Sequence, residues 1–206
     1  MDLQKKSVVA TERDEEKRSA FREGLKGVDP RRLLFVDESS TNIAFTPRYG
    51  RAPKGERAHG RAPRNWGKNV TLISSISVEG MGPSMSIEGP SDTESFGIYM
   101  REILAPALEA GRIVLMDNLS VHTSGWVREL IEERGCQLWL LPAYSPDFNP
   151  IGEAFSKVKA LLRRARARAL EALFEATEKA LGAVSAQDAR GYFGHCGYMR
   201  PRAHSI

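Results

Sequence analysis

Two aspartates stand where apolar runs of strand length end. Asp37 follows the apolar run in LLFVDES, and Asp117 follows the one in IVLMDN. Ligands of open α/β sheets bind at the carboxyl ends of the strands, so these carboxylates can belong to one site. Either aspartate alone could simply cap a turn. A third acid-containing turn follows the apolar run CQLWLLPAYSP, and this favours several carboxylates that converge on one edge of a sheet.

Carboxylates held close together repel one another, and divalent cations such as Mg²⁺ relieve that repulsion through oxygen ligands. Two such ions can activate an attacking water or hydroxyl and stabilise the leaving oxygen of a phosphodiester. The formal net charge of +4 and the pI near 9.2 are compatible with a polyanionic substrate. The residue types therefore predict metal-dependent phosphodiester chemistry.

The basic residues are concentrated in one segment that has no helical periodicity. Between positions 48 and 68, seven Arg or Lys residues accompany a single Glu, interspersed with Gly, Pro and Trp66. Such a loop is typical of a polyanion-binding segment, and Trp66 could stack on a base or contact a partner chain. The predicted DNA-binding residues are Arg48, Arg51, Lys54, Arg57, Arg61, Arg64 and Lys68. A second basic cluster, between positions 157 and 168, fits a solvated helix face equally well.

The elements that must position these residues follow the order strand, strand, strand, helix, strand, helix, strand, helix. Continuous apolar strands that alternate with helices predict an α/β domain whose sheet is covered on both faces. The β-rich runs NVTLISSISVEG and PSMSIEG predict antiparallel neighbours and hence a mixed sheet. A helix is expected over 91–111 with Ser91 as its cap and Glu94 at the capping-box spacing. The last helix is expected from Asn149 to about Leu181, with a break along it left open.

Composition restricts the class of protein. At 206 residues, with 41% apolar and 27% charged residues, the chain is long enough for one domain with extensions. The longest apolar runs are too short to span a bilayer, and the first residues lack the apolar stretch of a signal peptide. Two cysteines make neither a disulfide framework nor a zinc-binding spacing. We therefore expect a cytoplasmic protein that has no membrane partner.

The segments VDES, MDNLSVH and LPAYSPDFNPI…FSKVK resemble the three catalytic blocks of DDE transposases of the mariner-like superfamily, bacterial insertion-sequence branch. The resemblance extends from about Arg32 to the DARGYFGHCGY tail. It implies an RNase H-like fold with a mixed five-stranded sheet and helices on both faces. It also implies hydrolytic cleavage at transposon ends and attack of the freed 3′-hydroxyl on target DNA, with two Mg²⁺ or Mn²⁺ ions.

By this resemblance Asp37 and Asp117 are the first two metal ligands, and Asn118 and His122 match the second block. The loop over 40–69 occupies the place of a clamp that contacts DNA and a partner subunit. The implied partners are double-stranded DNA, both transposon ends and target, and a second copy of the chain in a nucleoid-associated homodimer. The implied organisation is an arm or linker over 1–28, the catalytic domain over 29–181 and a tail over 182–206.

The third carboxylate departs from the family pattern. The family motif places its glutamate directly after N-P-I, where this chain has Gly152, and Glu153 follows. With Asn149 as cap, position 152 is the third helical residue, and Glu153 is rotated from it by roughly 100°. Glu153 is therefore predicted either as the third catalytic and metal-binding carboxylate or as a surface partner of Lys157. Asp147 is expected to be a turn residue and is a lesser candidate for the missing ligand.

Residues 1–28 do not fit the pair of helices of a helix-turn-helix region, which mariner-like transposases use to find transposon ends. End recognition is therefore expected from a separate helix-turn-helix polypeptide or a longer fusion product. Three hypotheses follow: a transposase catalytic domain that is either active or weakened by Gly152, a degenerate and catalytically silent remnant that still binds DNA or dimerises, and a domain that has lost catalysis and serves as an accessory protein.

Overall fold

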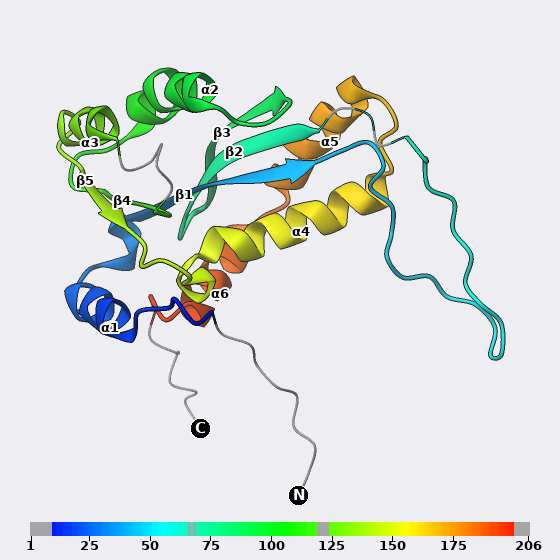
Figure 1. The fold of residues 1–206 in the computed structure, drawn as a ribbon, viewed down its shortest axis with the longest axis horizontal. Coiled ribbons are helices and arrows are strands. Elements are labelled where there is room, and N and C mark those ends of the chain that lie inside the picture. Colours follow the sequence, from blue (N-terminus) through cyan, green and yellow to red (C-terminus); the bar gives the residue numbers. More distant parts are fainter. Residues whose placement is uncertain (1–9, 66, 68, 119–123, 200–206) are drawn as a thin grey trace, which may run out of the picture.

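A computed structural model describes residues 10–65, 67, 69–118 and 124–199. Its five strands form one mixed sheet in the spatial order β3-β2-β1-β4-β5 (Figure 1). The strands are β1 (Leu33–Thr41), β2 (Val70–Ser77), β3 (Gly80–Glu88), β4 (Ile113–Met116) and β5 (Gln137–Leu140). β2 pairs antiparallel with β1 and β3, whereas β4 pairs parallel with β1 and β5. The predicted mixed five-stranded sheet is confirmed.

Helices cover both faces of this sheet. They are α1 (Glu15–Gly24), α2 (Thr93–Ile98), α3 (Gly125–Glu132), α4 (Pro150–Ala165), α5 (Leu170–Gly182) and α6 (Ala186–His195). α2 and α3 lie on one side of the sheet, and α4 crosses the other side (Figure 1). A short 3₁₀ turn, η4 (Pro146–Phe148), links the end of β5 to α4. The helical cover explains why the central strands are apolar on both faces.

β1 shows how the two faces are divided. Leu33 and Phe35 are buried in the core that α4, α5 and α6 share with the sheet. Leu34 and Val36 are buried in a second core, beneath α2 and α3. Side chains alternate between the faces of a strand, so Asp37 follows Phe35 onto the α4 side. The alternation along residues 33–36 of β1 therefore determines that Asp37, which follows them, faces α4.

The helix expected over 91–111 differs from the prediction at both ends. Its N-cap is Asp92, not Ser91, because the Asp92 carboxylate accepts the Ser95 N–H at 2.8 Å. The Ser95 hydroxyl in turn accepts the Asp92 N–H at 2.9 Å. Beyond α2 the chain widens into a π-helical turn, η2 (Tyr99–Leu104), and ends in a 3₁₀ turn, η3 (Ala105–Ala107). Pro106 accounts for this ending, because it has no N–H and clashes with the carbonyl four residues earlier.

The final helical region contains the break that the sequence left open. α4 ends at Arg166, which adopts a left-handed conformation with φ of 52°, and α5 begins four residues later. In the predicted arm, α1 is capped by Asp14, whose carboxylate accepts the Lys17 N–H at 3.0 Å. In the predicted tail, α6 packs against α4. The boundaries at positions 28 and 182 stay predictions.

No helix within the described ranges combines the length and the apolar character that a membrane span requires.

Candidate active site

Asp37 lies within β1, and Asp117 directly follows β4, the parallel strand beside it. β1 and β4 pair with Leu33 opposite Ile113 and Phe35 opposite Leu115. Two residues further, this register brings position 37 beside position 117, on the face that α4 covers. Adjacent strands lie about 4.8 Å apart, so the two carboxylates belong to one site. The structure brings together the first two predicted catalytic residues.

The surroundings of Asp37 disfavour its charged form. Burial raises the pKa of its carboxyl group to about 6, and the negative charges of Asp117 and Glu38 act in the same direction. Two hydrogen bonds oppose this shift of the pKa: the Glu38 N–H donates to Asp37 Oδ1 at 2.7 Å, and Asn149 Nδ2 donates to Oδ2 at 2.8 Å. A buried carboxylate that faces a second carboxylate is a site where a cation would be stabilised.

The two aspartates open into a cavity of about 510 Å³. It is bounded by the end of β4, the segment after β5 and the start of α4. The lining residues are Asp37, Asp117, Asn118, Leu141, Pro142, Ala143, Tyr144, Ser145, Pro146 and Asn149. The cavity therefore combines two carboxylates and two side-chain amides with a wall of apolar and backbone atoms.

The first turn of α4 contributes Asn149 to this cavity. Asn149 is the N-cap of the helix, but its side chain makes no capping hydrogen bond. Its amide is directed at Asp37 instead. From the sequence, Asn149 was predicted only as a helix cap, since Asn before Pro at a helix start has that role in many proteins. Its hydrogen bond to Asp37 in the aspartate cavity was not predicted.

Gly152 occupies the third position of α4, as predicted. It is exposed, and a Cβ atom built on it would have no neighbour within 4 Å. Its amide donates to the Asn149 carbonyl oxygen at 3.2 Å, so the first turn is closed without a side chain at this position. A larger residue at position 152 would therefore extend into open space.

Glu153 lies away from the aspartates. Its Oε1 is 2.5 Å from Nδ1 of His195, at the end of α6, and accepts a longer contact of 3.9 Å from the Cys196 thiol. The predicted pair with Lys157 does not form, because Lys157 binds Asp188 at 2.7 Å. Glu153 is absent from the lining of the aspartate cavity. Within the described ranges, no group of three His, Cys, Asp or Glu residues has the geometry of a metal site.

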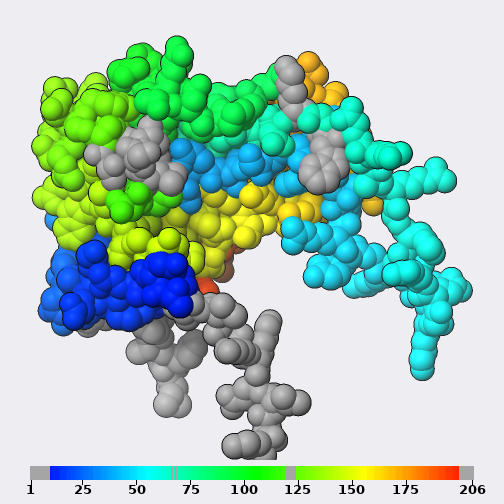
Figure 2. All heavy atoms as spheres, in the orientation of Figure 1, coloured from blue at the N-terminus to red at the C-terminus, as the bar shows by residue number. Residues whose placement is uncertain are grey.

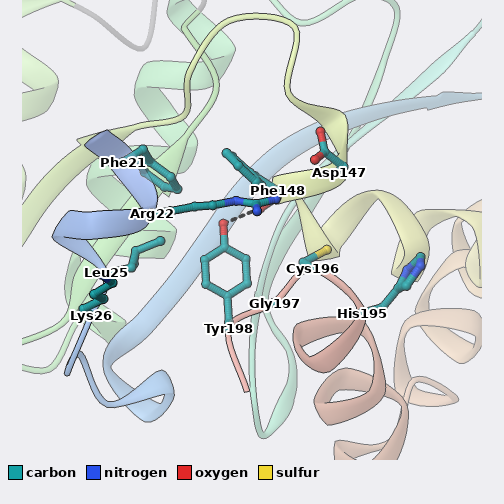
Figure 3. A pocket seen from close by; sticks show the side chains of 10 residues that line it. All are labelled: Phe21, Arg22, Leu25, Lys26, Asp147, Phe148, His195, Cys196, Gly197 and Tyr198. Atoms are coloured by element: carbon teal, nitrogen blue, oxygen red, sulfur yellow. Dashed lines mark hydrogen bonds between the residues drawn. The ribbon is translucent and has the colours of Figure 1, made fainter. Parts of the chain in front are cut away.

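A second hollow, of about 360 Å³, lies between α1, η4 and the end of α6 (Figure 3). His195 and Cys196 line it together with Asp147, Phe148 and residues of α1. Asp147, the lesser candidate for the missing ligand, is bound by Arg18 of α1 through two hydrogen bonds, of 2.6 and 3.1 Å. No sequence pattern indicated this pair, because its partners are 129 positions apart.

Residues 32–174 match the family described as DDE superfamily endonuclease. The matched region includes both aspartates, the basic loop and the first turn of α4. The chain belongs to this family. No curated protein sequence matches it.

The fold of this chain is similar to that of the Mos1 mariner transposase. A pre-cleavage Mos1 transpososome superposes with a TM-score of 0.69 at 17% identity, covering 96% of this chain and 65% of the other. A Mos1 paired end complex with Mg gives 0.72 at 16% identity, over 96% and 64% of the two chains. The Mos1 catalytic domain gives 0.61 at 14% identity, over 93% and 92%. The chain thus spans about the length of that catalytic domain and less than two thirds of the longer chains.

The basic loop, which connects β1 and β2, extends away from the body of the molecule (Figure 2). Its base is attached to the region after α4, where Arg168 donates to the carbonyl oxygens of Ile43 and Phe45 at 2.6 and 3.0 Å. Six predicted DNA-binding residues are exposed: Arg48, Arg51, Lys54, Arg57, Arg61 and Arg64. Lys68, Trp66 and His122 lie outside the described residues.

Proposed function

We propose that the chain is the catalytic domain of a transposase that cleaves DNA at transposon ends and joins the freed 3′-hydroxyl to target DNA. The single observation that carries this proposal is the pair Asp37 and Asp117 at one sheet edge, above a cavity of about 510 Å³. Membership of the DDE endonuclease family supports it. Assignment to the bacterial insertion-sequence branch is part of the proposal.

The residues of the cavity suit a hard divalent cation. Asp37 and Asp117 offer carboxylate oxygens, and Asn149 Oδ1 is a buried oxygen that has no hydrogen-bond partner among the described residues. Mg²⁺ and Mn²⁺ prefer such oxygen ligands. Paired end complexes of the similar Mos1 protein were solved with Mg and with Mn. We propose that Asp37 and Asp117 hold the same kind of ion here.

The bound ions would polarise the phosphodiester and activate the attacking oxygen. The chain itself contributes positioning. Asn149 holds the Asp37 carboxylate in one orientation through its 2.8 Å hydrogen bond. The basic loop would hold the DNA backbone, and we propose that it contacts a second copy of the chain on DNA. Recognition of the transposon ends by a separate helix-turn-helix polypeptide also remains part of the proposal.

Position 152 supports a second candidate, a catalytically silent remnant that still binds DNA. Only two carboxylates line the aspartate cavity as described, and the place of the family's third is taken by Gly152. The contact between Glu153 and His195 argues against Glu153 as the replacement ligand. The two candidates differ in catalysis but share the fold, the aspartate pair and the basic loop.

Mn²⁺ binding and Mn²⁺-dependent nicking of plasmid DNA test both candidates. We expect the chain to bind Mn²⁺ by calorimetry and to nick DNA, and we expect Asp37→Ala or Asp117→Ala to abolish both. Glu109→Gln, which removes an acid paired with Arg112 outside the cavity, serves as the control and should retain both activities. Binding of Mn²⁺ without nicking would favour the silent remnant. Absence of Mn²⁺ binding would contradict the proposed metal site.

A further inference from the structure

α1 lies outside the region that matches the family, yet it contacts the turn that leads into the active site. Arg18 forms a forked contact with Asp147 of η4, from Nη1 to Oδ1 at 3.1 Å and from Nη2 to Oδ2 at 2.6 Å. The Arg18 side chain is only 4% exposed. Two parallel bonds between guanidinium and carboxylate fix distance and orientation together. The contact therefore determines where η4 lies relative to α1.

Phe148, the next residue of η4, is held by the same helix. The Arg18 guanidinium lies 4.1 Å from the centre of the Phe148 ring, and the Phe21 ring stacks on it at 5.5 Å. Figure 3 shows Phe21, Arg22 and Phe148 together beside the hollow. From the other side, the Tyr198 hydroxyl donates to the Phe148 carbonyl oxygen at 2.6 Å. The turn is thus held on two sides.

Asn149 directly follows these residues and is fixed by the same turn. Its N–H donates to the Pro146 carbonyl oxygen at 3.1 Å, and the Phe148 N–H donates to that of Ser145 at 3.0 Å. Its side chain then reaches Asp37. A continuous series of contacts therefore runs from α1 through η4 to the Asp37 carboxylate within β1.

We propose that Arg18 is a positioning residue for the active site: through Asp147 and η4 it fixes Asn149, and through Asn149 it orients the Asp37 carboxylate. The consequence for metal binding rests on the proposed function, in which Asp37 is a ligand. The Asn149–Asp37 hydrogen bond itself does not depend on that function. Groups that orient metal ligands alter metal affinity when they are removed, typically by about 10- to 100-fold.

A purely structural role for Arg18, which would only attach α1 to the domain, predicts a loss of stability and nothing more. The pair Lys157–Asp188 provides a matched control. It joins α4 to α6 at 2.7 Å and is partly buried, but its contacts do not lead to Asn149. Arg18→Ala and Lys157→Ala therefore each remove one ion pair between helical elements, and only the first disturbs η4.

The experiment follows two signals in the full chain. One is the nuclear magnetic resonance signal of the Asn149 side-chain NH₂, which is identified by its absence in Asn149→Ala and reports the bond to Asp37 without metal. The other is the Mn²⁺ dissociation constant, measured by calorimetry. We expect Arg18→Ala to shift the Asn149 signal to that of a solvated amide and to raise the Mn²⁺ dissociation constant about tenfold. Lys157→Ala should change neither.

Arg18→Lys tests the forked geometry and serves if Arg18→Ala does not fold. The lysine ammonium can make one of the two bonds to Asp147. The Asn149 signal and the Mn²⁺ dissociation constant of Arg18→Lys should therefore lie between those of the unaltered chain and those of Arg18→Ala. An unchanged Asn149 signal in both Arg18 variants would overturn the assignment, as would equal effects of Lys157→Ala. If the unaltered chain bound no Mn²⁺ while Arg18→Ala still shifted the Asn149 signal, the metal site would be rejected and the positioning role would stand.

Discussion

Asn149 donates a hydrogen bond of 2.8 Å to Asp37 across 112 positions of the chain. This bond joins the N-terminus of α4 to the middle of β1, the two elements that meet at the proposed catalytic site. It also explains why an Asn in the N-cap position leaves the helix without a side-chain cap. The Asn149 side chain thus orients the Asp37 carboxylate instead of capping α4.

The raised pKa of Asp37 predicts that this residue destabilises the folded chain when no metal is bound. The pKa lies at about 6 in the folded chain and near 3.8 in the unfolded chain, so the folded chain binds more protons between these values. The contribution of Asp37 to the free energy of unfolding should therefore fall as the pH rises from about 4 to about 6, by up to about 3 kcal/mol. The difference in the free energy of unfolding between the unaltered chain and Asp37→Asn, measured by chemical denaturation at a series of pH values in EDTA, separates this contribution from that of carboxyl groups whose pKa is lowered, such as Asp188.

Asp37→Asn removes the buried charge. It should raise the free energy of unfolding by about 1 to 2 kcal/mol at pH 8. This is less than the full contribution of the buried charge, because the NH₂ group of the new asparagine would face a donor, either the Glu38 N–H or the Asn149 amide. The gain should vanish near pH 4. Asp29→Asn is the control: binding to Arg31 lowers the pKa of the Asp29 carboxyl, so this change should lower the stability at neutral pH. A loss of stability in Asp37→Asn at pH 8 would disprove the prediction.

Gly152→Glu is expected to raise Mn²⁺-dependent cleavage at least tenfold. The new side chain enters open space, because nothing lies within 4 Å of its Cβ position, and it stands where the family motif has its glutamate. Removing a helical glycine also stabilises α4 by up to about 1 kcal/mol. Cleavage and thermal stability should therefore be measured together.

Gly152→Gln separates these two effects. Glutamine gives α4 nearly the same gain in helix propensity without a carboxylate, so it should raise stability but not cleavage. Asp117→Ala combined with Gly152→Glu should be inactive. Equal cleavage rates for Gly152→Glu and Gly152→Gln would show that position 152 does not supply a ligand.

The contact between Glu153 and His195 should stabilise the chain only at low pH. Glu153 raises the pKa of the His195 imidazole, both as a hydrogen-bond acceptor and through its charge. The contribution is therefore complete below the unfolded value near 6.5 and is lost as the pH rises through the higher folded value. His195→Gln should lower the free energy of unfolding at pH 6 and have no effect at pH 9.

Glu153→Gln tests the same contact and the catalytic prediction at once. It should reduce stability at pH 6, as His195→Gln does, and the double variant should lose no more than either single variant. Its Mn²⁺ dissociation constant should equal that of the unaltered chain. A marked loss of Mn²⁺ affinity in Glu153→Gln, with none in His195→Gln, would restore Glu153 as the third ligand.

The exposed basic loop predicts a strong salt dependence of DNA binding. Each phosphate contact that is removed should reduce the slope of log affinity against log salt concentration by about 0.9. Arg57→Ala with Arg61→Ala should therefore lower the slope by about 2, as measured by fluorescence anisotropy with duplex DNA. Lys26→Ala with Arg128→Ala removes the same charge from ion pairs outside the loop and should leave the slope unchanged.

Apolar strand runs made the sheet and its first two acids predictable. Asp37 and Asp117 were placed together because each follows an apolar run of strand length, because ligands of open α/β sheets bind at the carboxyl ends of the strands, and because both match the family's catalytic blocks. The break after Ala165 was left open for the opposite reason. It depends on the left-handed conformation of Arg166, for which the residue type gives no signal.

The partners of the side chains around α4 were not predictable. Glu153 and Lys157 stand at helical spacing, yet they do not pair with each other. Glu153 contacts His195 and Lys157 binds Asp188, and both of these partners belong to α6. Arg18 reaches η4 from a segment that the sequence indicated as an arm or linker, without any sign of the residues it contacts. Such pairs depend on how distant elements pack, and neither periodicity nor motif spacing contains that information.

The open space beside Gly152 has a genetic consequence. Every glycine codon becomes an acidic codon through one change at its second base, giving glutamate or aspartate according to the third. A Cβ atom at position 152 would meet no atom within 4 Å, so the first carbon of either side chain fits without a neighbouring residue having to move. A copy with glycine at this position is therefore one base away from a copy with a carboxylate there.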